Sequence, residues 1–175
     1  MVDPGREFRK LPIETLTALV QSFQRGFYRF NESMGIDVHF RRRETSLSYS
    51  IPYGVIIAMI GVVGDCRGGL SVILDQSGFS RYVGALTGGI IRPDVEDAIA
   101  LSSIGEMLNM VAGRMALEMS KEGFSVDITP PQTFCGERIR QVESERTAHI
   151  ILPYLLSESD GGDGVAHLVI NSPNL

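Results

Sequence analysis

The chain has 175 residues, of which 43% are hydrophobic and 21% are charged, and its formal net charge is −5. This length suits one well-buried domain or two tightly fused halves, and the composition is that of an ordinary globular protein. The negative charge argues against nucleic acid or an anionic membrane surface as the main partner.

Two features of the sequence bear on cellular location. The N-terminal residues lack the apolar core of a signal peptide, and the most hydrophobic run, residues 55–63, is too short to cross a bilayer. Cys66 and Cys135 stand singly and far apart, so we expect buried or half-buried free thiols instead of a disulfide or a metal pair. A reduced, cytoplasmic protein is therefore expected.

The first part of the chain predicts one helix and two strands. Residues 12–34 are predicted to be helical, because a proline suits the first turn, apolar residues recur at helical spacing and a glycine follows. Residues 36–40 and 47–51 alternate apolar and polar side chains, as half-buried strands do. The basic triplet Arg41–Arg43 between them is interpreted as a solvated strand end, with a docking patch for an acidic partner as the alternative.

The next segment predicts a buried hairpin and a short helix. Residues 54–63 are rich in valine and isoleucine, which favours a buried central strand. The glycine-rich residues 64–69 suit a hairpin turn, so residues 70–74 are the expected partner strand. Residues 77–86 place apolar side chains at helical spacing and end before two glycines, which predicts a short helix.

Residues 98–123 form the longest run with helical periodicity. At about 100° per residue, one side of this helix is apolar and is expected to face the core. That stripe consists of Leu101, Ile104, Leu108, Val111, Met115 and Met119. On the opposite side, Ser102, Glu106, Asn109 and Gly113 lie within roughly 60° of each other by the same arithmetic. A hydroxyl, a carboxylate and a carboxamide therefore share one outward face, and a glycine follows one turn later.

The last third of the chain predicts further strands. Residues 124–128 alternate as a strand and stop at a pair of prolines, and residues 133–136 are expected to form a short extended piece. Residues 141–146 are polar and predict a turn. Residues 148–156 and 165–170 are then expected to pair as a hairpin.

Residues 1–175 are predicted to form a single domain. Within it the order helix, strand, hairpin occurs twice, which indicates an internal duplication with halves at about residues 12–92 and 93–172. Gly35-Ile36-Asp37-Val38 after the first helix matches Gly123-Phe124-Ser125-Val126 after the long one, about 88 residues later. Two such units can pair their strands into one sheet and pack both long helices on a shared face. The predicted fold is a pseudo-twofold α/β sandwich.

The pattern Ser-x-x-x-Glu-x-x-Asn from Ser102 to Asn109, continued by Met-Val-Ala-Gly, resembles the signature of the CheC/CheX family. The strand and prolines of residues 126–131 also resemble the segment that follows this helix in the family. The family fold is a mostly antiparallel sheet with two long helices side by side on one face. No Glu-x-x-Asn pair occurs at the duplicated position in the first helix, so the chain looks CheX-like. The N-terminal lead-in and the Asp160–Gly164 loop have no match in the family.

The resemblance implies a phosphatase that hydrolyses the aspartyl phosphate of a CheY-like receiver domain in chemotaxis or another two-component pathway. Asn109 would orient the attacking water, a task that suits a carboxamide because it both donates and accepts hydrogen bonds. Glu106 would pair with a lysine of the receiver, and Ser102 would support the site at its edge. Gly113 would let the partner approach closely, and close helix packing is the alternative explanation for this glycine.

The scheme needs no metal or cofactor in this chain, since the receiver supplies Mg²⁺. The histidines lack ligand spacing, so core or surface roles are expected for His39, His149 and His167. The Asp160–Gly164 loop lacks the further acidic positions of a calcium loop and predicts a hairpin turn.

Two alternatives to catalysis remain open. The flagellar switch proteins are similar in fold and use it for assembly without the Glu/Asn pair, so a non-catalytic binding or adaptor module is the first. Sequestration of a phosphorylated receiver is the second. The resemblance also implies a homodimer that pairs through strands of its sheets.

Overall fold

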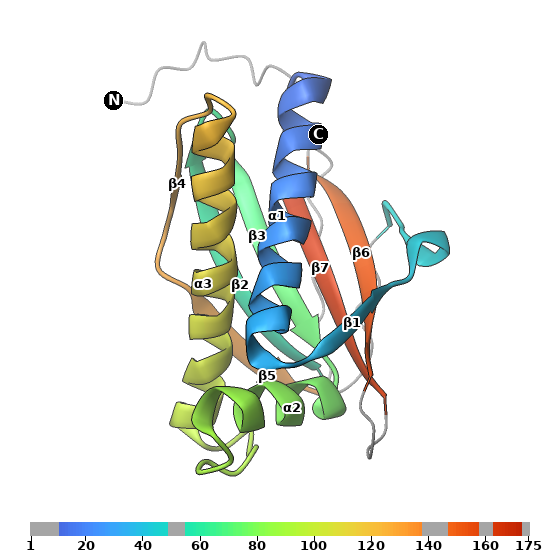
Figure 1. The fold of residues 1–175 in the computed structure, drawn as a ribbon, viewed down its shortest axis with the longest axis vertical. Coiled ribbons are helices and arrows are strands. Elements are labelled where there is room, and N and C mark those ends of the chain that lie inside the picture. Colours follow the sequence, from blue (N-terminus) through green and yellow to red (C-terminus); the bar gives the residue numbers. More distant parts are fainter. Residues whose placement is uncertain (1–10, 49–54, 138–146, 158–162, 173–175) are drawn as a thin grey trace.

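The computed structural model of the protein describes residues 11–48, 55–137, 147–157 and 163–172. These residues form one layer of helices packed on one face of a single antiparallel sheet, as the sequence predicted (Figure 1). In chain order the elements are α1 (Ile13–Met34), β1 (Asp37–Phe40), the 3₁₀ turn η1 (Arg42–Glu44), β2 (Val55–Gly64), β3 (Gly68–Leu74), α2 (Gln76–Thr87), α3 (Ala98–Lys121), β4 (Val126–Ile128), β5 (Gln132–Gly136), β6 (Ala148–Ser157) and β7 (Gly164–Ser172).

The described strands form a seven-stranded sheet in the order β1-β6-β7-β3-β2-β4, and β5 also pairs with β2. The predicted hairpins β2–β3 and β6–β7 are both present, and they meet where β3 pairs with β7. Along the outer edge of β2, β4 pairs with residues 62–64 and β5 with residues 55–59. Two prolines lie between β4 and β5, where the pairing with β2 is interrupted.

The two long helices lie side by side on the sheet, and α2 crosses one end of them (Figure 1). They run antiparallel, as two ion pairs between them show: Arg25 pairs with Glu122 at 2.8 Å, and Arg29, later in α1, pairs with Glu118, earlier in α3, at 3.0 Å. Gly26 sets their distance: a Cβ built on it would lie 2.7 Å from the backbone oxygen of Val111. None of the described helices meets the length and hydropathy needed to span a membrane.

A glycine ends α1, and hydrogen bonds and aromatic packing hold this helix against α2 and the sheet. Gly35 adopts a left-handed conformation with φ of 68° and ends α1, as expected from the sequence. The buried Tyr82 hydroxyl of α2 donates to Asn31 Oδ1 of α1 at 2.7 Å. Burial raises the pKa of Tyr82 well above its ordinary value, so this hydroxyl keeps its proton. Phe27 packs against Tyr154 of the sheet with ring centroids 4.9 Å apart.

Three predicted segments differ from the structure. β4 begins at Val126 and not at residue 124, because the Phe124 N–H donates to Met119 O at the end of α3 and the Ser125 N–H donates to Asp65 Oδ2. The predicted strand at 47–51 is wrong for residues 47 and 48, which lie outside any strand, and its remainder lies outside the described residues. The predicted turn at 141–146 also lies outside them.

Two interpretations of polar segments have different outcomes. The triplet Arg41–Arg43 is exposed beside β1, as expected for a solvated strand end, and Arg41 pairs with Glu44 at 2.7 Å. The loop before β7 falls mainly on residues 158–162, which lie outside the described residues. The strands on either side of this loop, β6 and β7, are paired up to Leu156 and Gly164, which agrees with a hairpin.

The two cysteines are free, but they differ in exposure. Cys66 is buried as expected, whereas the prediction is wrong for Cys135, which is exposed on the short edge strand β5. Burial, with the charge of Asp65 as a smaller cause, raises the pKa of the Cys66 thiol to about 11. Cys66 is therefore a buried, protonated thiol at neutral pH.

We expect one rapidly reacting thiol in the native protein and a second only after unfolding, because a disulfide-exchange reagent needs an accessible thiolate. Reaction with such a reagent at pH 8, with and without denaturant, measures this. Cys135→Ser should remove the rapid phase alone. Two rapid phases in the folded wild type would contradict the packing around Cys66.

Candidate functional site

The site is built on α3, whose start is set by a side-chain cap. Asp97 accepts hydrogen bonds from the backbone N–H groups of Ile99 at 2.7 Å and Ala100 at 3.3 Å, which satisfies two donors at the free end of the helix. The predicted apolar stripe faces the core: Leu101 is half-buried and the others are buried, namely Ile104, Leu108, Val111, Met115 and Met119.

Neighbouring elements hold α3 on both flanks. On one flank α1 approaches closely at Gly26. On the other, a Cβ built on Gly105 would lie 3.1 Å from Thr133 Oγ1 of β5, so this strand also approaches α3 closely. Because α1, strands β2 and β4, and the edge strand β5 contact the other sides of the helix, its remaining side faces solvent.

The structure brings the four predicted site residues together on that remaining side. Ser102, Glu106 and Gly113 are exposed, and Asn109 is half-buried. Glu106 and Asn109 are separated by about 4.5 Å along the helix axis, at 1.5 Å per residue. Within the part of the chain that the structure describes, the Glu106 carboxylate and the Asn109 carboxamide have no hydrogen-bond or ion-pair partner. Both groups are available to a molecule that contacts α3 from outside.

Gly113 is open to solvent. A Cβ built on it would meet no described atom within 4 Å, in contrast to Gly26 and Gly105. The alternative of close helix packing is therefore wrong for Gly113. The role of this glycine in the approach of a partner stays a prediction.

The same outward side carries two apolar residues, Met110 and Leu117, for which the sequence alone predicted no role in the site. Met110 and Leu117 are exposed, although both belong to residue types that are usually buried. The sequence could have indicated them by their spacing. Intervals of four, three and four residues place four residues on one stripe of a helix, namely Glu106, Met110, Gly113 and Leu117.

The described residues contain no group of three or more His, Cys, Asp and Glu side chains arranged to hold a metal ion. The three histidines lie on β1, β6 and β7. His39 lies 3.3 Å from Asp37, and both are exposed. His167 is partly buried, and the loss of solvent lowers the pKa of its imidazole. These positions agree with the core and surface roles expected of the histidines.

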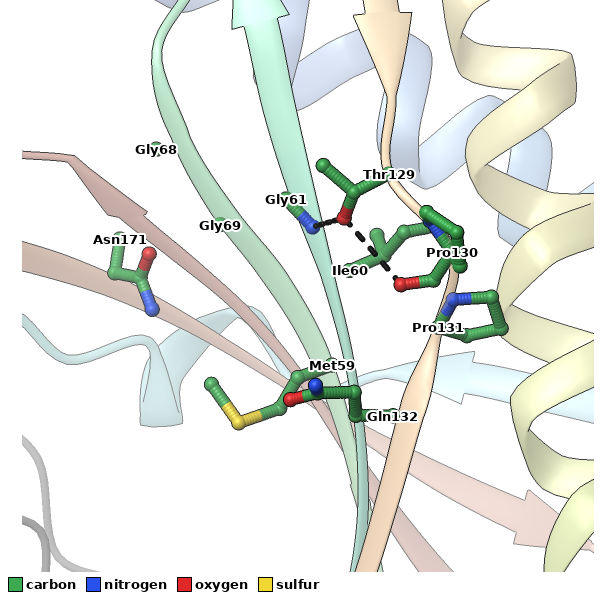
Figure 2. Close-up of a pocket in the computed structure, with 10 residues that line it drawn as sticks. All are labelled: Met59, Ile60, Gly61, Gly68, Gly69, Thr129, Pro130, Pro131, Gln132 and Asn171. Atoms are coloured by element: carbon green, nitrogen blue, oxygen red, sulfur yellow. Dashed lines mark hydrogen bonds between the residues drawn. The ribbon is translucent and has the colours of Figure 1, made fainter.

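A shallow groove of about 570 Å³ lies on the sheet (Figure 2). Its floor is low in side chains because Gly61 of β2 is paired with Gly69 of β3, and Gly69 with Asn171 of β7. At its rim the Gly61 N–H donates to Thr129 Oγ1 at 2.8 Å (Figure 2). The groove is lined by none of the four predicted site residues, so the outward side of α3 and this groove are separate features.

Comparisons with known proteins agree with the fold, and the family model that matches spans α3. Residues 56–154 match the family model described as chemotaxis phosphatase CheX. The CheY-P phosphatase CheX of Thermotoga maritima is 30% identical over 139 residues, which cover 79% of this chain and 86% of that protein.

Two solved structures show the fold. The chemotaxis protein CheX from Vibrio vulnificus has a TM-score of 0.69 at 21% identity, over 88% of this chain and 99% of that one. A chain of the CheX–CheY–BeF₃–Mg²⁺ complex from Borrelia burgdorferi has a TM-score of 0.64 at 17% identity, over 87% of this chain and 97% of that one.

Proposed function

This chain belongs to the chemotaxis phosphatase CheX family, and we propose that it hydrolyses the aspartyl phosphate of a CheY-like receiver domain. The observation that carries the proposal is the outward pair Glu106 and Asn109 on α3, which has no partner among the described residues. The similarity to the CheY-P phosphatase CheX of Thermotoga maritima supports the same reaction.

In the proposed reaction a water oxygen attacks phosphorus, and the bond between phosphorus and the aspartyl oxygen breaks. The products are inorganic phosphate and the free aspartate of the receiver. Little covalent chemistry is needed from the protein, so catalysis consists mainly of placing the water in line. The Asn109 carboxamide accepts a hydrogen bond from this water and donates one to it, without a change of protonation.

Glu106 is proposed to fix the receiver in register. Its exposed carboxylate is one helical turn from Asn109 and has no ion pair within the described residues. A lysine of the receiver can therefore bind it without breaking an internal contact, which favours complementary docking. Ser102 lies one further turn along the same side and would contact the edge of the receiver. The Mg²⁺ of the reaction belongs to the receiver in this scheme.

The experiment that tests the function compares loss of aspartyl phosphate from a CheY-like receiver of the same organism with and without this protein. The receiver is charged with a small phosphodonor and used in about twentyfold excess. A catalyst speeds the decay of the whole receiver pool through repeated turnovers. An adaptor or a sequestering module binds the phosphorylated receiver but leaves the decay unchanged or slows it, and that result would contradict the proposal.

The open space at Gly113 leads to a prediction with opposite effects on stability and function. Gly113→Ala should stabilise the fold by about 0.5–1 kcal/mol, because alanine favours a helix over glycine and the new Cβ meets no described atom. It should raise the KM for the phosphorylated receiver if the partner's backbone approaches α3 there. Urea unfolding and steady-state kinetics measure the two effects.

The matched control for Gly113→Ala is Gly84→Ala on α2. Gly84 is also helical and also open, with no described atom within 4 Å of its Cβ position. This variant should gain the same stability and keep the wild-type KM. An unchanged KM in Gly113→Ala would remove Gly113 from the docking surface.

The quaternary structure and the cellular location are also matters of proposal. We propose a cytoplasmic homodimer, in which copies pair through sheet edges. Among the described strands, β1 pairs only with β6, which leaves its other edge available for such a contact. Size-exclusion chromatography with light scattering would give twice the chain mass, and a monomer at working concentrations would contradict the dimer.

A further inference from the structure

The outward side of α3 continues past the Glu106–Asn109 pair as a partly apolar stripe. Met110 and Leu117 are 40% and 59% exposed, and the open Gly113 lies between them. By contrast, the neighbouring Met107 and Val111 are fully buried. The core is therefore packed without Met110 and Leu117, and their exposure does not follow from the needs of folding.

Single exposed apolar residues are ordinary on protein surfaces. Met110 and Leu117 differ from such residues in their position next to the proposed site. Both lie on the stripe that begins with Glu106. At 1.5 Å per residue, Met110 is about 6 Å and Leu117 about 16 Å from Glu106 along the axis. A standard protein interface of about 800 Å² per partner is roughly 30 Å across. A folded domain that places its phosphoryl group at Asn109 has the size to cover both side chains.

We propose that Met110 and Leu117 form an apolar docking row that binds the receiver domain next to its phosphorylation site. This inference rests on the proposed phosphatase function. The apolar row supplies binding energy by removing its surface from water, while Glu106 supplies a charge contact at one end. Gly113 keeps the space between the two side chains open, so the receiver reaches both.

The receiver fits this row better than a second copy of the chain does. A second copy on the same row would cover Glu106 and Asn109 and exclude the substrate. The row is also distant in the sheet from β1, the edge proposed for self-pairing, because α3 packs over β2, β4 and β5 at the other side.

The test uses Met110→Ser, Leu117→Ser and the double variant, with Leu47→Ser as the matched control. Leu47 is 75% exposed, and the adjacent Ser46 is bridged to Ile151 of β6, away from the strands under α3. Each single variant should raise the KM for the phosphorylated receiver about fivefold, and the double variant at least about twentyfold. The kcat and the thermal midpoint should stay near those of the wild type, because neither side chain contacts the reacting atoms or the core.

Met110→Leu should restore binding, since it keeps an apolar side chain of similar size. Unchanged KM values in the double variant, or an equal rise in Leu47→Ser, would overturn the docking row. A change in oligomeric mass with an unchanged KM would assign the row to self-association and would also overturn it.

A titration with a beryllofluoride-activated receiver separates this proposal from the phosphatase function. If the wild type binds this receiver without hydrolysing the phosphorylated form, and the double variant binds at least about twentyfold more weakly, the docking row stands and the enzymatic function fails. If hydrolysis occurs and the double variant binds like the wild type, the function stands and the docking row fails. Absence of binding by the wild type overturns both.

Discussion

Asn109→Ala is expected to lower the kcat for receiver dephosphorylation by about 100-fold or more, while KM changes by less than about threefold. In the proposed mechanism the carboxamide acts on the attacking water, so its loss would remove positioning in the transition state and little of the binding surface. The side chain is half-buried on α3 and has no partner among the described residues, so its removal should leave the fold intact. Steady-state kinetics with a phosphorylated receiver measure both parameters.

Two further variants define what the residue does. Asn109→Asp keeps the size but loses the N–H donor and places a negative charge near the phosphoryl group, so it should be at least as impaired as the alanine variant. Ser102→Ala removes a polar group at the edge of the same side and should retain most of the activity. A wild-type kcat in Asn109→Ala would show that another group positions the water.

The second large effect concerns the contact between the long helices. Gly26→Ala should destabilise the protein by about 2 kcal/mol, because its Cβ would lie 2.7 Å from the backbone oxygen of Val111. Backbone atoms on both sides must move to relieve this contact. The intrinsic preference of a helix for alanine over glycine opposes the effect by about 1 kcal/mol and is the smaller term. Urea unfolding, followed by circular dichroism, measures the difference.

The control is again Gly84→Ala, where the same substitution in a helix meets open space and should stabilise the protein. The opposite signs at Gly26 and Gly84 separate the interhelical contact from helix propensity. Equal stabilisation by both substitutions would mean that α1 and α3 are not held as closely as the structure has them.

Local patterns were sufficient to predict most of the elements. The apolar stripe of α3, the glycine at the end of α1 and both hairpins were correctly placed, because each depends on side-chain periodicity or turn chemistry within a short segment. The start of β4 was not, because Ser125 is held by Asp65, which is 60 residues away in the chain. The close approach at Gly26 likewise depends on α3, and nothing near Gly26 in the sequence indicates it.

The candidate site was likewise predictable in part from local patterns and in part not. Helical periodicity predicted that Glu106 and Asn109 share an exposed side, and the structure confirms it. The roles proposed for them rest on the family resemblance, because a Glu-x-x-Asn pair is common in helices by chance. Periodicity also leaves Met110 outside the core stripe, but the meaning of an exposed methionine depends on the surface around it. That surface is known only once α1 and β5 are placed on either side of α3.

The most direct test of the proposed mechanism is a single-turnover measurement of aspartyl-phosphate decay in a labelled receiver, with saturating wild-type protein or Asn109→Ala. Binding of each protein is verified in parallel with the beryllofluoride-activated receiver. We predict that the wild type accelerates the decay and that the bound variant returns it to about the rate of the receiver alone. Equal decay with both proteins, at equal occupancy, would contradict the assignment of Asn109 as the residue that positions the water.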